Sequence, residues 1–74
     1  MKSVSFLRIA ASGNTEEEIR RHALDQGTAF FGTEDLEITS DIDIYPVNLF
    51  KYHGTIDIDH AYAAYVIVRK SAAR

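Results

Sequence analysis

The sequence predicts a small α+β domain in which one helix packs on one face of a three-stranded antiparallel sheet. Three observations support this prediction. A helix-start signal follows the first apolar segment at Thr15, residues 34–45 alternate between apolar and polar side chains, and residues 55–70 are apolar on both sides over their second half. The element order is therefore β-α-β-β. A strand that is apolar on both sides belongs in the middle of a sheet, so the last strand is expected between the other two, in the order 1-3-2.

The helix is predicted over residues 15–31. Thr15 and Glu18 have the spacing of a capping box, and the three consecutive glutamates after Thr15 lie at the positive end of the helix dipole. Gly27 lies inside this helix, where a glycine costs about 1 kcal/mol relative to alanine but allows a close approach to the sheet. We expect Gly32 to end the helix.

Five other segments complete the predicted order within one domain of 74 residues. They are a first strand over residues 2–11, a second strand over 34–45, a loop over 46–54, a last strand over 55–70 and a frayed tail over 71–74. The second strand has apolar side chains on one face and mostly acidic side chains on the other. Such alternation is typical of a strand with one buried face.

The acidic face of the second strand predicts a cluster of carboxylates across the hairpin. If both buried faces match, opposing residue numbers must add to an even number, and a sum near 100 centres the loop. Asp43 then lies opposite Asp57, and Asp41 lies opposite Asp59. Such a cluster would suit Mg²⁺, Ca²⁺ or Mn²⁺. The favoured alternative is a solvated hairpin edge whose charge discourages aggregation.

The small size of the chain favours self-association. A domain of this length buries only about 60% of the surface of its unfolded chain, and the sequence has no cysteine for disulfides. The loop after Pro46 is too apolar for a bare surface loop, which favours an interface, although it could instead fold over its own domain. The residues expected to contact a second copy, a protein partner or a small ligand are Leu49, Phe50, Tyr52, Tyr62, Tyr65 and Ile67.

Composition narrows the functional classes. The net charge of −3 and scattered basic residues argue against nucleic-acid binding, and no segment is apolar enough to span a membrane. No nucleophile–base pair or phosphate loop is recognisable, so no catalytic residue is predicted. We therefore expect a non-enzymatic, cytoplasmic, homo-oligomeric interaction protein. Two alternatives remain, an oligomer that sequesters a small molecule between subunits and a metal-binding module built on the four aspartates.

Two resemblances add to these expectations. The length, the element order and a helix that ends in Phe30 and Phe31 before a long hairpin resemble the dodecins, which are small oligomeric flavin-binding proteins. Dodecins stack the flavin on a tryptophan at the start of the second strand. This chain has no tryptophan, so flavin binding is not implied and no cofactor is predicted. Residues 15–36 (TEEEIRRHALDQGTAFFGTEDL) resemble short uncharacterised proteins of actinobacterial phages, which implies a phage-encoded protein in the host cytoplasm.

Overall fold

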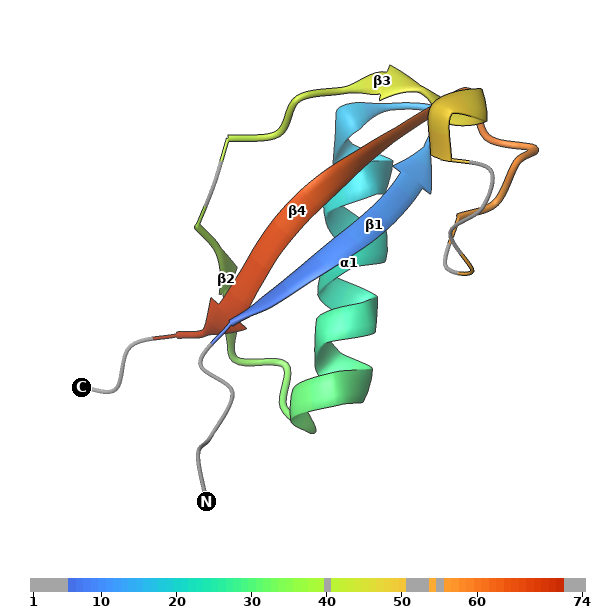
Figure 1. The fold of residues 1–74 in the computed structure, drawn as a ribbon. Helices are drawn as coiled ribbons and strands as arrows, with labels where there is room; N and C mark the ends of the chain where they lie inside the picture. Colours follow the sequence, from blue (N-terminus) through green and yellow to red (C-terminus); the bar gives the residue numbers. More distant parts are fainter. Residues whose placement is uncertain (1–5, 40, 51–53, 55, 72–74) are drawn as a thin grey trace.

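The computed structural model describes residues 6–39, 41–50, 54 and 56–71, and shows one helix packed against an antiparallel sheet (Figure 1). The central strand is the last one, with the first strand on one side and two short strands on the other. This confirms the predicted α+β class and the central place of the last strand. The elements are β1 (Leu7–Gly13), α1 (Glu16–Phe31), β2 (Leu36–Ile38), β3 (Tyr45–Pro46), the 3₁₀ helix η1 (Val47–Phe50) and β4 (Tyr62–Lys70).

The helix ends where it was predicted to end, and it begins one residue later, at Glu16, with Thr15 as its N-cap. The Glu18 N–H donates to Thr15 Oγ1 at 3.2 Å. The Glu18 carboxylate accepts from the Asn14 N–H at 2.8 Å, one residue earlier than the capping box predicts. At the other end, Gly32 has a φ of 75°, and its N–H donates to the Thr28 carbonyl at 2.9 Å. A left-handed residue at this position favours glycine.

The helix lies close to the sheet because its sheet-facing positions are small. Ala23 and Gly27 are buried beside Ile19 on this face. A Cβ placed on Gly27 would lie 3.0 Å from both Leu36 Cδ1 and Val68 Cγ1, so glycine permits the observed approach. The main core lies between α1 and the sheet. It contains Ile9, Ala11, Ile19, Ala23, Ala64, Val66 and Val68.

The pairing of β1 with β4 defines a second sheet face, opposite α1. Arg8 pairs with Ile67, Ala10 with Tyr65, and Ser12 with Ala63. Directly paired residues project to the same face, and their sequence neighbours Ile9, Ala11, Ala64 and Val66 fill the helix-side core. We call the surface formed by the first set, together with Phe6, Arg69 and the segments that cover it, the far face.

The other side of β4 corrects the predicted second strand. Instead of one strand over residues 34–45, the chain forms β2 and β3, and residues 41–44 between them have no regular structure. Glu37 pairs with Arg69, and Tyr45 pairs with Ala63. Between these two pairs the chain advances by eight residues on this side but by only six along β4. Two residues are therefore extra. An even insertion preserves the alternation of faces, which is why the hydrophobic pattern continues through the interruption.

The register confirms the predicted parity and corrects its value. Paired residue numbers add to 106 for β2 and 108 for β3, both even but not near 100. The cause is that β4 begins at Tyr62, whereas the last strand was predicted over 55–70. Residues 56–61 belong to the connection, and the His60 N–H donates to the Asp57 carbonyl in a turn. The hairpin is thus centred several residues later than predicted.

The chain ends also differ from the predicted bounds. The first strand was predicted over residues 2–11, but β1 covers Leu7–Gly13, and residues 1–5 lie outside the described part. The tail was predicted to fray from residue 71, but the Ser71 N–H donates to the Asp35 carbonyl at 2.8 Å. Residues 72–74 lie outside the described part. Within the described ranges, no helix has the length and apolar character required to cross a membrane.

Candidate docking surface

One end of the far face is covered by the chain itself. Phe50 of η1 is 5% exposed and packs on Ala10 and Ala63. Its ring centroid lies 5.0 Å from that of Tyr65 and 6.3 Å from that of Tyr45. Phe50 was predicted to contact a second copy or a partner. That prediction is wrong, because Phe50 packs on the far face of its own chain. The alternative prediction, that the loop folds over its own domain, is therefore right for this residue.

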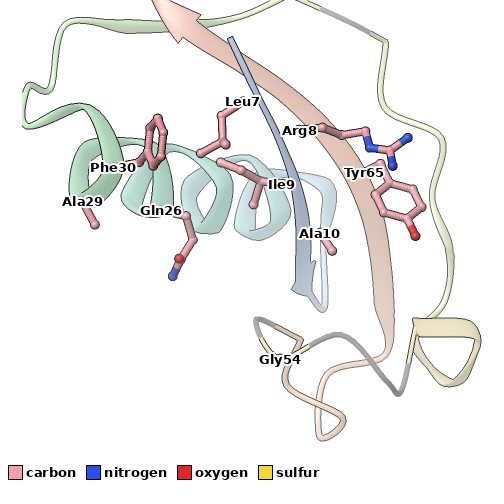
Figure 2. A pocket seen from close by; sticks show the side chains of 9 residues that line it. All are labelled: Leu7, Arg8, Ile9, Ala10, Gln26, Ala29, Phe30, Gly54 and Tyr65. Atoms are coloured by element: carbon pink, nitrogen blue, oxygen red, sulfur yellow. The ribbon is translucent and has the colours of Figure 1, made fainter. Parts of the chain in front are cut away.

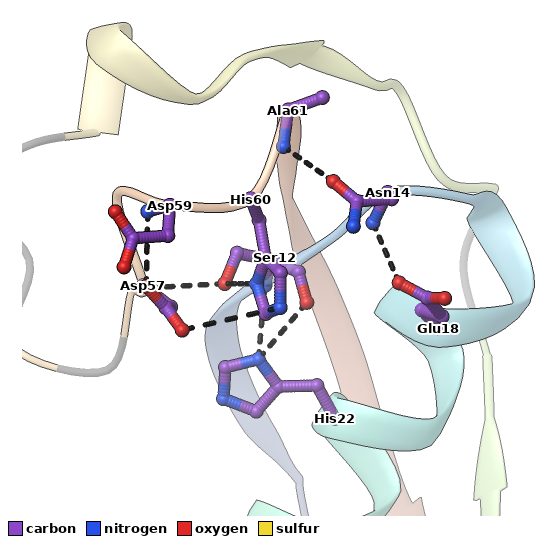
Figure 3. A network of polar contacts seen from close by, with 8 residues as sticks. All are labelled: Ser12, Asn14, Glu18, His22, Asp57, Asp59, His60 and Ala61. Atoms are coloured by element: carbon purple, nitrogen blue, oxygen red, sulfur yellow. Dashed lines mark hydrogen bonds and ion pairs between the residues drawn. The ribbon is translucent and has the colours of Figure 1, made fainter.

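A polar network closes the same end beside Phe50 (Figure 3). Ser12 is 1% exposed, and its hydroxyl oxygen accepts from the Asp57 N–H at 3.0 Å and lies 2.8 Å from His60 Nδ1. The Ser12 N–H donates to His22 Nδ1 of α1 at 2.9 Å. The Ala61 N–H donates to Asn14 Oδ1 at 2.9 Å. These contacts fasten residues 57–61 to the end of β1.

The network contains a serine, a histidine and an aspartate, but its geometry is not that of a nucleophilic triad. Ser12 is buried, and its hydroxyl oxygen already accepts from the Asp57 N–H, although Ser12 lines a hollow with His22 and His60. His60 Nε2 lies 4.0 Å from Asp57 Oδ2, beyond hydrogen-bond distance. The arrangement serves as a structural tie between the loop and the sheet.

The other end of the far face is exposed. Phe6 is 57% exposed and Tyr65 is 39% exposed, and both lie beside the partly exposed Ile67. The Arg8 guanidinium lies over the Tyr65 ring, 4.8 Å from its centroid, and Figure 2 shows these two side chains together, away from the helix. Arg69 is paired with Glu37 of β2. We call Phe6, Arg8, Tyr65, Ile67 and Arg69 the open patch.

The predicted interface residues therefore separate into several groups. Tyr65 and Ile67 lie in the open patch, and Leu49 is 66% exposed on η1. Tyr62 pairs with Gly13, so alternation directs it to the face opposite that of Tyr65, and the two tyrosines do not form one ligand site within a chain. Tyr52 lies outside the described residues.

The predicted acidic ladder is not formed, because the register that would have created it is wrong. Asp57 and Asp59 lie in the turn beside Ser12, and the Asp59 N–H donates to Asp57 Oδ1 at 2.9 Å. Asp41 and Asp43 lie in the irregular segment between β2 and β3. Among the described residues, no group of three or more histidine or acidic side chains is placed to hold a metal ion.

Phe6, Arg8 and Ser12 were not among the site residues predicted from the sequence. Phe6 and Arg8 share the alternation of the first strand, and that pattern could have placed them on the face opposite α1. Ser12 carried no local signal, since its partners Asp57 and His60 are distant in the sequence.

Comparisons with known proteins add no relative. The sequence matches no family model, no curated protein and no solved structure. The resemblances to dodecins and to phage proteins stay predictions, and the functional argument depends on the surface of this chain alone.

Proposed function

We propose that the chain is a non-enzymatic docking domain that associates with a second copy of itself through the open patch. The observation that carries the proposal is that the far face, buried at Ala63 beneath Phe50, becomes partly exposed further along β4. Ala63 is 0% exposed beneath Phe50, whereas Tyr65, two residues later, is 39% exposed. The apolar surface of the sheet thus continues from a buried part into a partly exposed one.

The composition of the open patch suits a protein partner. Its apolar part is made of two aromatic rings and a branched aliphatic side chain, and arginine residues flank it. Aromatic residues and arginine are enriched at interface hot spots. A small domain with limited core gains stability from such burial, so association and folding would support each other.

A second copy is the favoured occupant because the sheet carries complementary charges. Arg8 lies on β1, and the exposed carboxylates of Asp41 and Asp43 lie beyond β4 on the opposite side of the sheet. Among the described residues, none of these three side chains has an ion-pair partner of its own. One chain therefore supplies both halves of a charged contact, which a two-fold interface can use twice.

The test measures molar mass in solution. Light scattering after size-exclusion chromatography is expected to show a dimer at micromolar concentration, and Phe6→Ser is expected to weaken it by about tenfold or more. Ile58→Ser is the matched control. Ile58 is 66% exposed, comparable with Phe6, but lies in the connection before β4, beside the first half of α1 and not beside the open patch.

Two results would refute the proposal. One is a wild-type chain that stays monomeric through the micromolar range. The other is a dimer that Ile58→Ser weakens as much as Phe6→Ser does.

A further inference from the structure

We infer that the two-fold axis of this dimer runs along the strands, so that Arg8 of each copy faces Asp41 and Asp43 of the other. The inference rests on the proposed self-association and adds the orientation of the two copies. It follows from where the three charged side chains lie on the sheet and from the two ways in which a two-fold axis can stack sheets face to face.

The three charged residues lie at opposite sides of the sheet. Arg8 belongs to β1, which pairs with β4 on one side only. Asp41 and Asp43 belong to the segment that joins β2 to β3 on the other side of β4 (Figure 1). Ile42, between them, packs against the helix-side core, while both aspartates are exposed. The carboxylates therefore project away from the core on the side opposite β1.

The charges also lie at a similar height along the strands. Arg8 pairs with Ile67, and the Thr39 N–H donates to the Ile67 carbonyl at 3.0 Å, so these three residues form one row across the sheet. The Arg8 guanidinium reaches from this row to the Tyr65 ring, 4.8 Å from its centroid. Asp41 follows Thr39 by two residues in the direction of β3. The guanidinium and the first carboxylate are thus displaced from the row in the same direction.

Two sheets stacked face to face about a two-fold axis can be related in two ways that keep their strands aligned. An axis across the strands places each β1 over the other β1, so that Arg8 lies over β1 of the other copy and the aspartates lie over its β2–β3 side. An axis along the strands places each β1 over the β2–β3 side of the other copy. The first arrangement places like charges on the same side and keeps Arg8 away from the aspartates of the other copy, whereas the second pairs opposite charges twice. Like charges placed opposite each other at an interface are unfavourable, so the second arrangement is favoured.

Charge reversal with mixing tests this orientation. Arg8→Glu alone and the double variant Asp41→Lys/Asp43→Lys alone are each expected to weaken the dimer by about tenfold or more. An equimolar mixture of the two variants is expected to form dimers of mixed composition, because opposite charges again face each other at both contacts. Native mass spectrometry distinguishes the mixed dimer from either variant's own dimer.

Matched controls change the same charges elsewhere. Lys70→Glu reverses the charge of an exposed lysine. Lys70 lies opposite Leu36 in the β2–β4 pairing, at a position that faces the helix side of the sheet. Asp25→Lys/Glu34→Lys reverses two exposed carboxylates at and beyond α1. These controls are expected to leave the dimer unchanged to within about threefold.

The outcomes separate the orientation from the self-association. If the wild-type chain dimerises through the open patch but the mixture shows no recovery, the orientation is wrong while the docking proposal stands. A wild-type dimer that neither charge reversal weakens overturns the orientation in the same way. A wild-type monomer overturns both.

Discussion

Replacing Phe50 with alanine is expected to lower the free energy of unfolding, because Phe50 belongs to the core of its own chain. Its side chain is 5% exposed and contacts Ala10, Ala63 and the Tyr65 ring. Burying about 150 Å² of aromatic surface contributes roughly 4 kcal/mol, and truncating a buried phenylalanine costs about 3–5 kcal/mol. A 74-residue domain has a total stability of about 4–11 kcal/mol, so the loss is a large part of the whole.

The assay is thermal unfolding at several protein concentrations, with Leu49→Ala as the matched control. Leu49 is the adjacent residue of η1 and is 66% exposed, so its replacement is expected to change stability by less than about 0.5 kcal/mol. For Phe50→Ala, a loss of about 3 kcal/mol lowers the melting temperature by at least about 12 °C. The reasoning is refuted if both variants melt within a few degrees of each other. It is also refuted if the Phe50→Ala loss disappears at low concentration, which would place Phe50 between copies.

Two further substitutions test the packing described above, both by urea unfolding. Gly27→Ala is expected to destabilise the fold by up to about 2 kcal/mol, because the new methyl group meets Val68 and Leu36 at 3.0 Å and this overpacking exceeds the gain in helix propensity. A more stable variant would show that these neighbours move aside. Ser12→Ala is expected to cost about 1–3 kcal/mol, because the Asp57 N–H loses its acceptor. Unchanged stability would mean that the network does not hold the loop.

The helix and the strand order could be predicted because their signals are local. Thr15 and Glu18 stand three positions apart, and Gly32 follows the helix directly, so short sequence windows contain both caps. The two-sided apolar character of β4 placed it in the centre of the sheet, since every face of such a strand needs a cover. The even parity of the register followed from the same alternation.

The value of the register and the content of the far face could not be predicted. Residues 56–59 alternate between apolar and polar side chains as a strand does, yet the contacts of Asp57 and His60 with Ser12 hold this segment in a loop. Those contacts join residues more than forty positions apart in sequence. The same loop placement removed the predicted carboxylate ladder. A local pattern therefore gave the faces of the strands but not which distant residue would meet Ser12.

The contact between His22 and Ser12 has a consequence for how the edge of this sheet meets other strands. His22 Nδ1 accepts from the Ser12 N–H on the side of β1 that faces away from β4. At that position of the sheet edge, the Ser12 N–H already donates to a side chain of the same molecule, so it is not available to pair with a further strand. Edge strands with unpaired backbone groups are the places where strands of other chains can add and where aggregation begins. The imidazole therefore blocks the pairing of a further strand at this position of β1.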